Sequence, residues 1–199
     1  MKRCILIQGP TDRLHIQENK KCWKNYDIIF STWVDSDKTA YDTTDTILYN
    51  EYPISSHPNN WGLQRVSTLN GIVLAKELGY DRVLKWRSDF KTNNAKNLLN
   101  LFDIDKFNFY SFIDQRGGYI TDFFMEGNIN EMYNIFNTTE GGEFPERILT
   151  TRVYELGLDK KSNFICNSLN AESNIYWHKY SYWFTENIPQ PQYLNYIKK

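Results

Sequence analysis

The fold is decided by the stretch LQRVSTLNGIVLAKELGYDRVLKWRSD, which occupies residues 63–89. Its first part predicts a helix over about 63–78, because apolar residues recur there at three- and four-residue steps. Gly79 follows, at the position where a glycine commonly ends a helix. The apolar run Arg82–Trp86 then predicts a buried strand that ends at Arg87-Ser88-Asp89. A helix that leads directly into a strand is typical of an α/β protein.

Three further strands are predicted upstream, over residues 3–8, 26–33 and 46–49. Together with the stretch above they predict the α/β class, with a mostly parallel central sheet flanked by helices. Ligands of such sheets bind where the strands end at their carboxyl edge, so the strand ends form the candidate site. Three of these ends carry polar residues: Gln8-Gly9-Pro10, Ser31-Thr32-Trp33 and Arg87-Ser88-Asp89.

The second half of the chain predicts a mixture of helices and strands. The polar segment 20–25 is assigned no element, and the tail over 176–193 is rich in aromatic residues. The expected elements are helices at 94–102, 130–136 and 145–156, and strands at 107–113 and 119–125, the last interrupted by Asp122.

The composition fits one globular domain. The chain has 199 residues, of which 41% are hydrophobic and 24% charged, and it shows no internal repeat or linker. We therefore expect a single domain over 1–199. The net charge of −1 argues against a nucleic-acid partner, because phosphate contacts dominate that kind of affinity.

The location of the protein is predicted from three further features. No apolar run approaches the ~18 residues of a membrane span. The segment after Met1 lacks the apolar core and cleavage site of a signal peptide. Cys4, Cys22 and Cys166 are odd in number and far apart, so neither a disulfide framework nor a zinc site is expected. These features favour a cytoplasmic protein, in the host cytoplasm if the source is viral.

Asp89 and Arg87 are the strongest candidates for chemistry. A carboxylate directly after a strand can hold Mg²⁺ or Mn²⁺ against a diphosphate. Arg87 lies on the same side of an extended chain and can steady either a phosphate or Asp89 itself. A purely structural Arg–Asp pair explains the same spacing equally well. The turn Gln8-Gly9-Pro10 matches neither a dinucleotide fingerprint nor a P-loop, although its glycine permits close approach of a ligand.

Several acidic residues are candidates for a general base. Asp122 and Glu126 flank an aromatic pair, and Glu143 and Glu146 surround Pro145. Each of them taken alone is more often a solvated acid. The three histidines form no spaced cluster, although His178 in the aromatic tail could reach a sugar or a metal.

Four blocks in order resemble the WavE-type glycosyltransferases of lipopolysaccharide synthesis, a family with related domains in large DNA viruses. They are Ile5–Pro10, Ile28–Trp33, Gln64–Gly71 and Val83–Asp89, with weaker matches at Thr121–Gly127 and Pro145–Arg147. The resemblance covers roughly residues 3 to 150. This sequence differs from the pattern of the family at Leu63-Gln64-Arg65, at Trp86 and at Glu126.

This resemblance implies a GT-A-like fold and a metal-dependent, inverting glycosyltransferase. The fold would comprise a nucleotide-binding half at about 1–92 and an acceptor-side half at about 93–199. Asp89 would ligate Mn²⁺ or Mg²⁺, and Arg65 and Arg87 would face the diphosphate or the donor sugar. The nucleotide of a UDP-, GDP- or dTDP-linked sugar would be lined by Gln8, Gly9, Pro10 and Thr32. Asp122 or Glu146 would be the base that activates a glycan acceptor.

Two other function classes stay open at this point. A sugar-1-phosphate nucleotidyltransferase shares the sheet and the metal, but it would need more glycine than Gly9-Pro10-Thr11-Asp12-Arg13 offers. A non-catalytic carbohydrate-binding module would use the many aromatic residues and would need neither metal nor nucleotide. The chain is also compatible with one domain of a longer protein.

Overall fold

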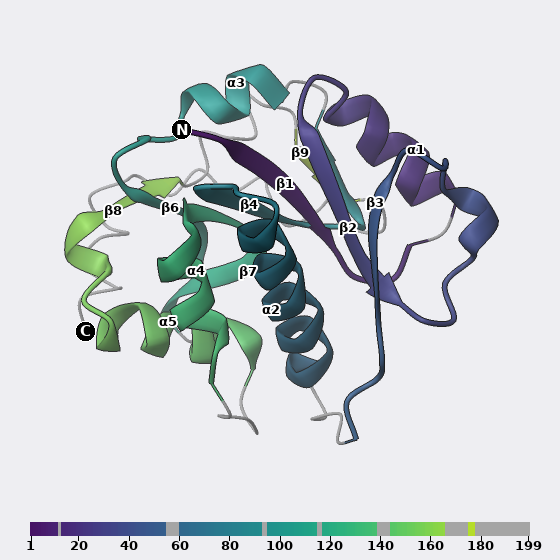
Figure 1. Cartoon of the computed structure of the whole chain (residues 1–199). Helices are drawn as coiled ribbons and strands as arrows, with labels where there is room; N and C mark the ends of the chain where they lie inside the picture. Colours follow the sequence, from purple (N-terminus) through teal and green to yellow (C-terminus); the bar gives the residue numbers. More distant parts are fainter. Residues whose placement is uncertain are drawn as a thin grey trace.

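A mostly parallel, seven-stranded sheet forms the centre of the computed structural model (Figure 1). The structure describes residues 1–11, 13–54, 60–92, 95–114, 117–138, 144–165 and 175–177. The sheet order is β3-β2-β1-β4-β7-β6-β8, and β7 runs antiparallel to both of its neighbours. The strands are β1 (Arg3–Gln8), β2 (Asp27–Trp33), β3 (Thr46–Asn50), β4 (Arg82–Arg87), β6 (Phe107–Asp114), β7 (Gly117–Asn128) and β8 (Ser162–Ile165).

Helices cover both faces of this sheet (Figure 1). One face, here called the α2 face, is covered by α2 (Trp61–Glu77), α4 (Ile129–Phe136) and α5 (Pro145–Glu155). The opposite face, the α1 face, is covered by α1 (Arg13–Cys22) and α3 (Ala95–Asn100). Strand alternation decides which side chains enter which core. In β1, Cys4 and Leu6 pack on the α2 face, whereas Ile5 and Ile7 pack on the α1 face.

The close packing of α2 on the sheet depends on a glycine. A Cβ atom added at Gly71 would lie 2.4 Å from Cδ1 of Leu6, which is fully buried in β1. The helix therefore lies as near to β1 as its backbone permits. The first turns of α2 contact the end of β2, where Oγ of Ser31 donates to the carbonyl of Ser67, and reach β7 through Gln64, which donates to Asp122.

The predicted fold class is confirmed, as are the strands expected at 3–8, 26–33, 46–49 and 82–86. The helices expected in the second half are present with ends shifted by a few residues. The helix predicted at 63–78 runs from Trp61 to Glu77. None of the helices in the described part of the chain combines the length and the apolar character needed to cross a bilayer.

Some elements were missed by the sequence patterns. Helix α1 was not predicted, because its sequence is mostly polar. It buries Ile16 and Asn19. The short strands β5 (Phe90–Thr92) and β9 (Ile175–Trp177) were also missed, because each exists only by pairing with the other across the chain. Strand β8 and the 3₁₀ turns η1 (Lys38–Ala40) and η2 (Asp159–Lys161) complete the missed elements.

The predicted interruption at Asp122 is wrong, because β7 runs through it as one strand. The register with β6 nevertheless shifts at this point. Met125 pairs with Phe109, and Ile120 pairs with Ser111, so residues 121–124 lie opposite one residue of β6. An irregularity of this kind redirects side chains and is common beside functional sites.

Candidate functional site

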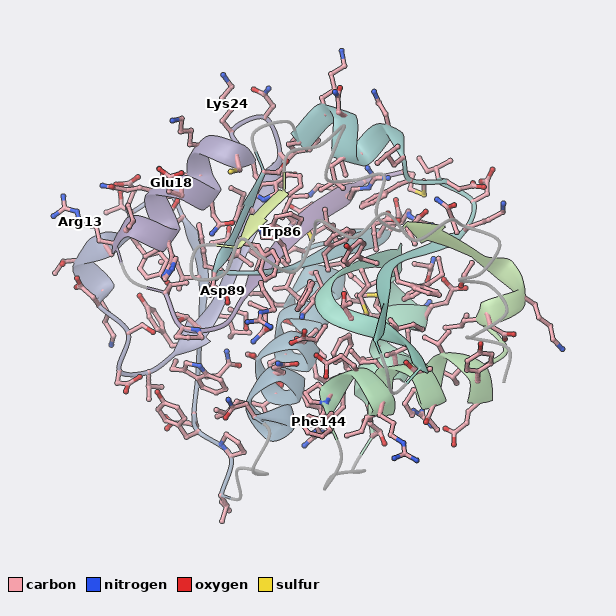
Figure 2. All side chains as sticks on the ribbon, turned by 180° about the vertical axis from the view of Figure 1, so that it is seen from behind. Arg13, Glu18, Lys24, Trp86, Asp89 and Phe144 are labelled. Atoms are coloured by element: carbon pink, nitrogen blue, oxygen red, sulfur yellow. The ribbon has the colours of Figure 1, made fainter. Side chains whose placement is uncertain are left out.

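Polar side chains from several strands meet at the carboxyl edge of the sheet. Gln8 at the end of β1 pairs in register with Ser31 of β2 and with Arg87 of β4. Since Leu6 and Val83 belong to the core of the α2 face, the alternation places Gln8, Lys85 and Arg87 on that face as well. Figure 2 shows the end of β4 from behind, with Asp89 near the centre of the molecule below Trp86.

Arg87 lies between two carboxylates at the end of β4. Its Nε and Nη2 atoms donate to Oδ1 and Oδ2 of Asp89 at 2.9 and 2.7 Å. Its Nη1 atom donates to Oδ1 and Oδ2 of Asp122 at 3.3 and 3.1 Å. Arg87 and Asp89 are 22% and 27% exposed, whereas Asp122 is 2% exposed. The Arg87–Asp89 pair therefore exists, and it lies where a ligand from solvent can reach it.

Asp122 is fixed from two further sides. Gln64 in the first turns of α2 donates its Nε2 to Oδ2 of Asp122 at 2.5 Å. The ammonium of Lys85 donates to the backbone carbonyl of Asp122. Neither Gln64 nor Lys85 was among the predicted site residues. Lys85 precedes Arg87 by two residues in the same strand, and this spacing was a signal that could have identified it.

Lys85 is an unusual group because its side chain is fully buried. Burial lowers the pKa of this ammonium from 10.5 to about 8, although the charge of Asp122 opposes the change. Burial of a lysine disfavours its charged form, so a compensating partner is needed. The carboxylates and the carbonyl around it provide that compensation.

Glu146 reaches the same cluster from the first turn of α5. This helix is fixed to β7 through Thr150, whose Oγ1 accepts from the amide of Ile120 at 2.9 Å and donates to the carbonyl of Glu146 at 2.6 Å. Burial raises the pKa of the Glu146 carboxyl, and the charge on Asp122 raises it further. Of the two predicted bases, Asp122 is hydrogen-bonded to the guanidinium of Arg87, whereas the pKa of Glu146 lies above the ordinary value for glutamate.

A cluster of hydroxyl groups occupies the α1 face behind the ends of β1 and β2. Thr32 is fully buried, with its Oγ1 at 3.1 Å from Oγ1 of Thr11 and at 2.6 Å from Oγ of Ser36. Thr11 is also hydrogen-bonded to the hydroxyl of Tyr41. Thr32 therefore has partners within the protein, and its contact with a nucleotide stays a prediction.

Among the buried polar atoms that have no hydrogen-bond partner within the described residues, three belong to Gln and Thr side chains at the end of β1 and on α2. They are Oε1 of Gln8, Oε1 of Gln64 and Oγ1 of Thr68. Gln8 is only 4% exposed. An unpaired buried acceptor costs free energy, and such atoms are commonly completed by water or by a ligand. This part of the α2 face therefore has unused capacity to accept hydrogen bonds.

The turn after β1 is tightly packed against the end of β4. Gly9 has a φ of +121°, and a Cβ atom added there would lie 3.0 Å from Oγ of Ser88. That hydroxyl donates to the carbonyl of Pro10 at 2.6 Å. The glycine is therefore required for both its backbone conformation and its close approach to β4. Pro10 itself is exposed at the mouth of the site.

The remaining predicted residues are separate from the cluster or outside the described residues. Arg65 is half-buried on α2 and makes no polar contact with the other candidates in the described part of the chain. Glu126 belongs instead to a buried structural pair, in which Nε of Arg82 donates to it at 2.6 Å. Glu143 and His178 lie outside the described residues.

The expected metal site is poorly matched by the donor set. The oxygens of Asp89 and Asp122 all accept hydrogen bonds from Arg87. Among the residues that the structure describes, no three His, Cys, Asp or Glu side chains are arranged to hold a metal ion. The residues present therefore do not fit a divalent cation in this arrangement, and the role of Asp89 as a metal ligand stays a prediction.

Comparisons with known proteins connect this fold to a group of transferases. No family model matches the chain, and no curated protein matches it. A putative nucleotide-diphospho-sugar transferase from Desulfovibrio desulfuricans is similar in structure, with a TM-score of 0.58 and 10% identity over 83% of this chain and 80% of that one. A 4-diphosphocytidyl-2C-methyl-D-erythritol synthase from Anaerococcus prevotii has a TM-score of 0.53 and 12% identity over 99% and 97% of the two chains.

A third similar structure is a glycosyltransferase involved in the glycosylation of the major capsid of PBCV-1. Its TM-score is 0.51 and its identity 13%, over 82% of this chain and 80% of that one. Identities this low establish the fold alone, so membership in the WavE-type family stays a prediction. The chain has a GT-A-like α/β fold, which it shares with these structures.

Proposed function

We propose that this chain is a glycosyltransferase, which moves a sugar from a nucleotide-sugar donor to a hydroxyl of a glycan or glycoprotein acceptor. The observation that carries the proposal is the cluster of Arg87, Asp89, Asp122 and Glu146 at the carboxyl edge of a GT-A-like sheet. Ligands of open α/β sheets bind at that edge. The likeness to a nucleotide-diphospho-sugar transferase and to a glycosyltransferase supports a nucleotide sugar as the donor.

The donor half of the reaction is assigned to the ends of β1 and β4. Arg87 carries a planar, permanently charged guanidinium that suits the oxygens of a diphosphate, and a diphosphate can approach it from the partly exposed side of its pair with Asp89. The unpaired Oε1 of Gln8 can accept a hydrogen bond from the nucleoside part of a UDP-, GDP- or dTDP-linked sugar. Gly9 permits backbone approach at the same point, beside the exposed ring of Pro10. Arg65 would act on the donor only after a change of its side-chain position.

The acceptor half is assigned to Glu146. A base must remove the proton of the attacking hydroxyl, and its efficiency rises when its pKa approaches the working pH. The burial of Glu146 and its proximity to the charge of Asp122 move its pKa in that direction. Direct attack assisted by one base would invert the anomeric centre. The carboxylate of Asp122, bonded to Arg87 and Gln64, would then position these two side chains.

Nucleotidyl transfer is the second candidate. It is supported by the likeness to the Anaerococcus synthase, which extends over 99% of this chain. Two 4-diphosphocytidyl-2C-methyl-D-erythritol synthases are among the similar structures, and the other has a TM-score of 0.57. The single glycine in the turn after β1 counts against this candidate, because a triphosphate would need more backbone donors there. A carbohydrate-binding module is disfavoured by the buried charges of the cluster.

The products of the reaction distinguish these candidates. Purified protein is incubated with UDP-, GDP-, dTDP- and CMP-sugars, with and without an acceptor mixture, and the released nucleotide is measured. A parallel assay with nucleoside triphosphates and sugar phosphates measures pyrophosphate. We expect nucleotide release from one donor, and a loss of about 10²-fold or more in Glu146→Gln. Glu155→Gln, at the exposed end of the same helix, is the matched control and should retain the rate.

Pyrophosphate release alone would favour the second candidate. Glycan binding in calorimetry, without any effect of nucleotides, would favour the binding module.

A further inference from the structure

The arginine at the end of β4 occupies the space between the two carboxylates that a divalent cation would need. Three nitrogen atoms of Arg87 donate hydrogen bonds to these carboxylates, two to Asp89 and one to Asp122. Gln64 adds a fourth donor, on Oδ2 of Asp122. Every carboxylate oxygen of this pair of acids therefore faces at least one N–H group.

The charges of the cluster also balance without a metal. Two cations, Lys85 and Arg87, lie among the two carboxylates Asp89 and Asp122. A metal ion that bridged Asp89 and Asp122 would have to displace the guanidinium or lie next to it. Both arrangements are unfavourable, because the displaced arginine would lose its partners and adjacent cations repel each other.

We infer that Arg87 itself supplies the positive charge that holds the donor diphosphate, so that nucleotide binding needs no divalent cation. The inference rests on the proposed function and assigns the charge of the site to the protein rather than to Mn²⁺ or Mg²⁺. Arg87 touches the diphosphate from the partly exposed side of the Asp89 pair, where its side chain is 22% exposed. Lys85, which is fully buried, adds positive charge beneath Arg87 without touching the ligand.

Nucleotide binding with and without chelator tests this inference. UDP, GDP and dTDP are titrated into the full chain by isothermal calorimetry, in buffer with EDTA and in buffer with Mn²⁺. We expect one nucleotide to bind with a Kd in EDTA that lies within about threefold of its Kd in Mn²⁺. Binding that requires Mn²⁺ and disappears in EDTA would overturn the inference and leave the proposed function intact. Absence of binding in both buffers would overturn the proposed function together with the inference.

Two substitutions separate the role of the arginine from that of a metal ligand. Arg87→Met should weaken nucleotide binding in EDTA at least tenfold, and Lys76→Met, on the exposed part of α2, should not. Asp89→Asn should retain binding in EDTA or strengthen it, because Arg87 loses a competing partner for the phosphate oxygens. A metal site on Asp89 predicts the opposite, namely loss of binding in Asp89→Asn and rescue of Arg87→Met by added Mn²⁺. Thermal melting of each variant without nucleotide verifies that the fold is intact.

Direct measurement of the metal gives a second readout. The electron paramagnetic resonance signal of free Mn²⁺ falls when the ion binds to a macromolecule. We expect the signal with UDP, GDP or dTDP to be unchanged by added protein beyond what the nucleotide alone removes. A protein-dependent loss of the signal in wild type that is absent in Asp89→Asn would refute the inference.

Discussion

The buried ammonium of Lys85 gives the stability of the protein a pH dependence that needs no knowledge of the substrate. The pKa of this group is lowered from 10.5 to about 8 by burial. Between these two values the unfolded chain binds more protons than the folded one, so the free energy of unfolding must rise with pH. A tenfold change in an equilibrium is worth about 1.4 kcal/mol, so the full rise attributable to Lys85 is about 3 kcal/mol.

The perturbation is Lys85→Met, which keeps an unbranched side chain that is one heavy atom shorter and removes the charge. Urea unfolding of wild type and variant is followed from pH 7 to 10.5, and the difference between the two free energies of unfolding is plotted against pH. Over this window we expect the free energy of unfolding of wild type to rise by about 3 kcal/mol relative to that of the variant. The reason is that only wild type has a buried charge whose cost disappears when the ammonium loses its proton. Taking the difference removes the contributions of other groups. Cys4 is one of them, because it titrates within this window in the unfolded chain, whereas burial raises its pKa in the folded state from 9.0 to about 12.

The matched control is Lys76→Met, since this lysine is exposed on α2. Its curve should run parallel to that of wild type throughout. If the curves of wild type and Lys85→Met were also parallel, the ammonium would have an ordinary pKa in the folded state. That result would refute the burial of its charge, and with it the assignment of Lys85 to the cluster.

Three further predictions concern packing, a buried pair and the base. Gly71→Ala should destabilise the protein by about 1–3 kcal/mol in urea unfolding, because the added methyl group must displace the buried Leu6; an unchanged midpoint would mean that α2 lies farther from β1. Glu126→Gln should cost about 3–5 kcal/mol in the same assay, because it leaves the guanidinium of Arg82 without its charged partner; a cost under 1 kcal/mol would indicate that this arginine is solvated. The rate of sugar transfer should rise with pH through a pKa above the ordinary value for glutamate and level off once Glu146 is ionised; a Glu146→Asp variant with an unchanged midpoint would exclude it as the titrating base.

Local sequence patterns were sufficient to predict most of the helices and strands. The spacing of apolar residues predicted α2, and the apolar runs predicted β1, β2 and β4, since each of these buries one or both faces. Helix α1 was not predicted because its sequence is mostly polar, and its buried residues are only Ile16 and Asn19. Pairing across long separations also left no local trace, as in β5 with β9.

The candidate site was also predicted only in part, because local patterns identified some of its residues but not which of them lie together. The pair of Arg87 and Asp89 could be expected from the sequence, because residues two apart in an extended chain lie on one side. Asp122 and Glu146 were identified as acids, but nothing local connected them with Arg87. Their proximity results from the antiparallel pairing of β7 with β4 and from the docking of α5 on β7.

The sequence by itself determined the α/β class, the strand ends that form the site and the residue types that occupy them, because hydrophobic periodicity and turn residues act over a few positions. Only the tertiary structure decided what those residues do to one another. It placed the guanidinium of Arg87 between two carboxylates, buried Lys85 beneath it and raised the pKa of Glu146. Charge pairing and desolvation depend on which strands and helices meet in space, and these meetings join residues that lie far apart along the chain.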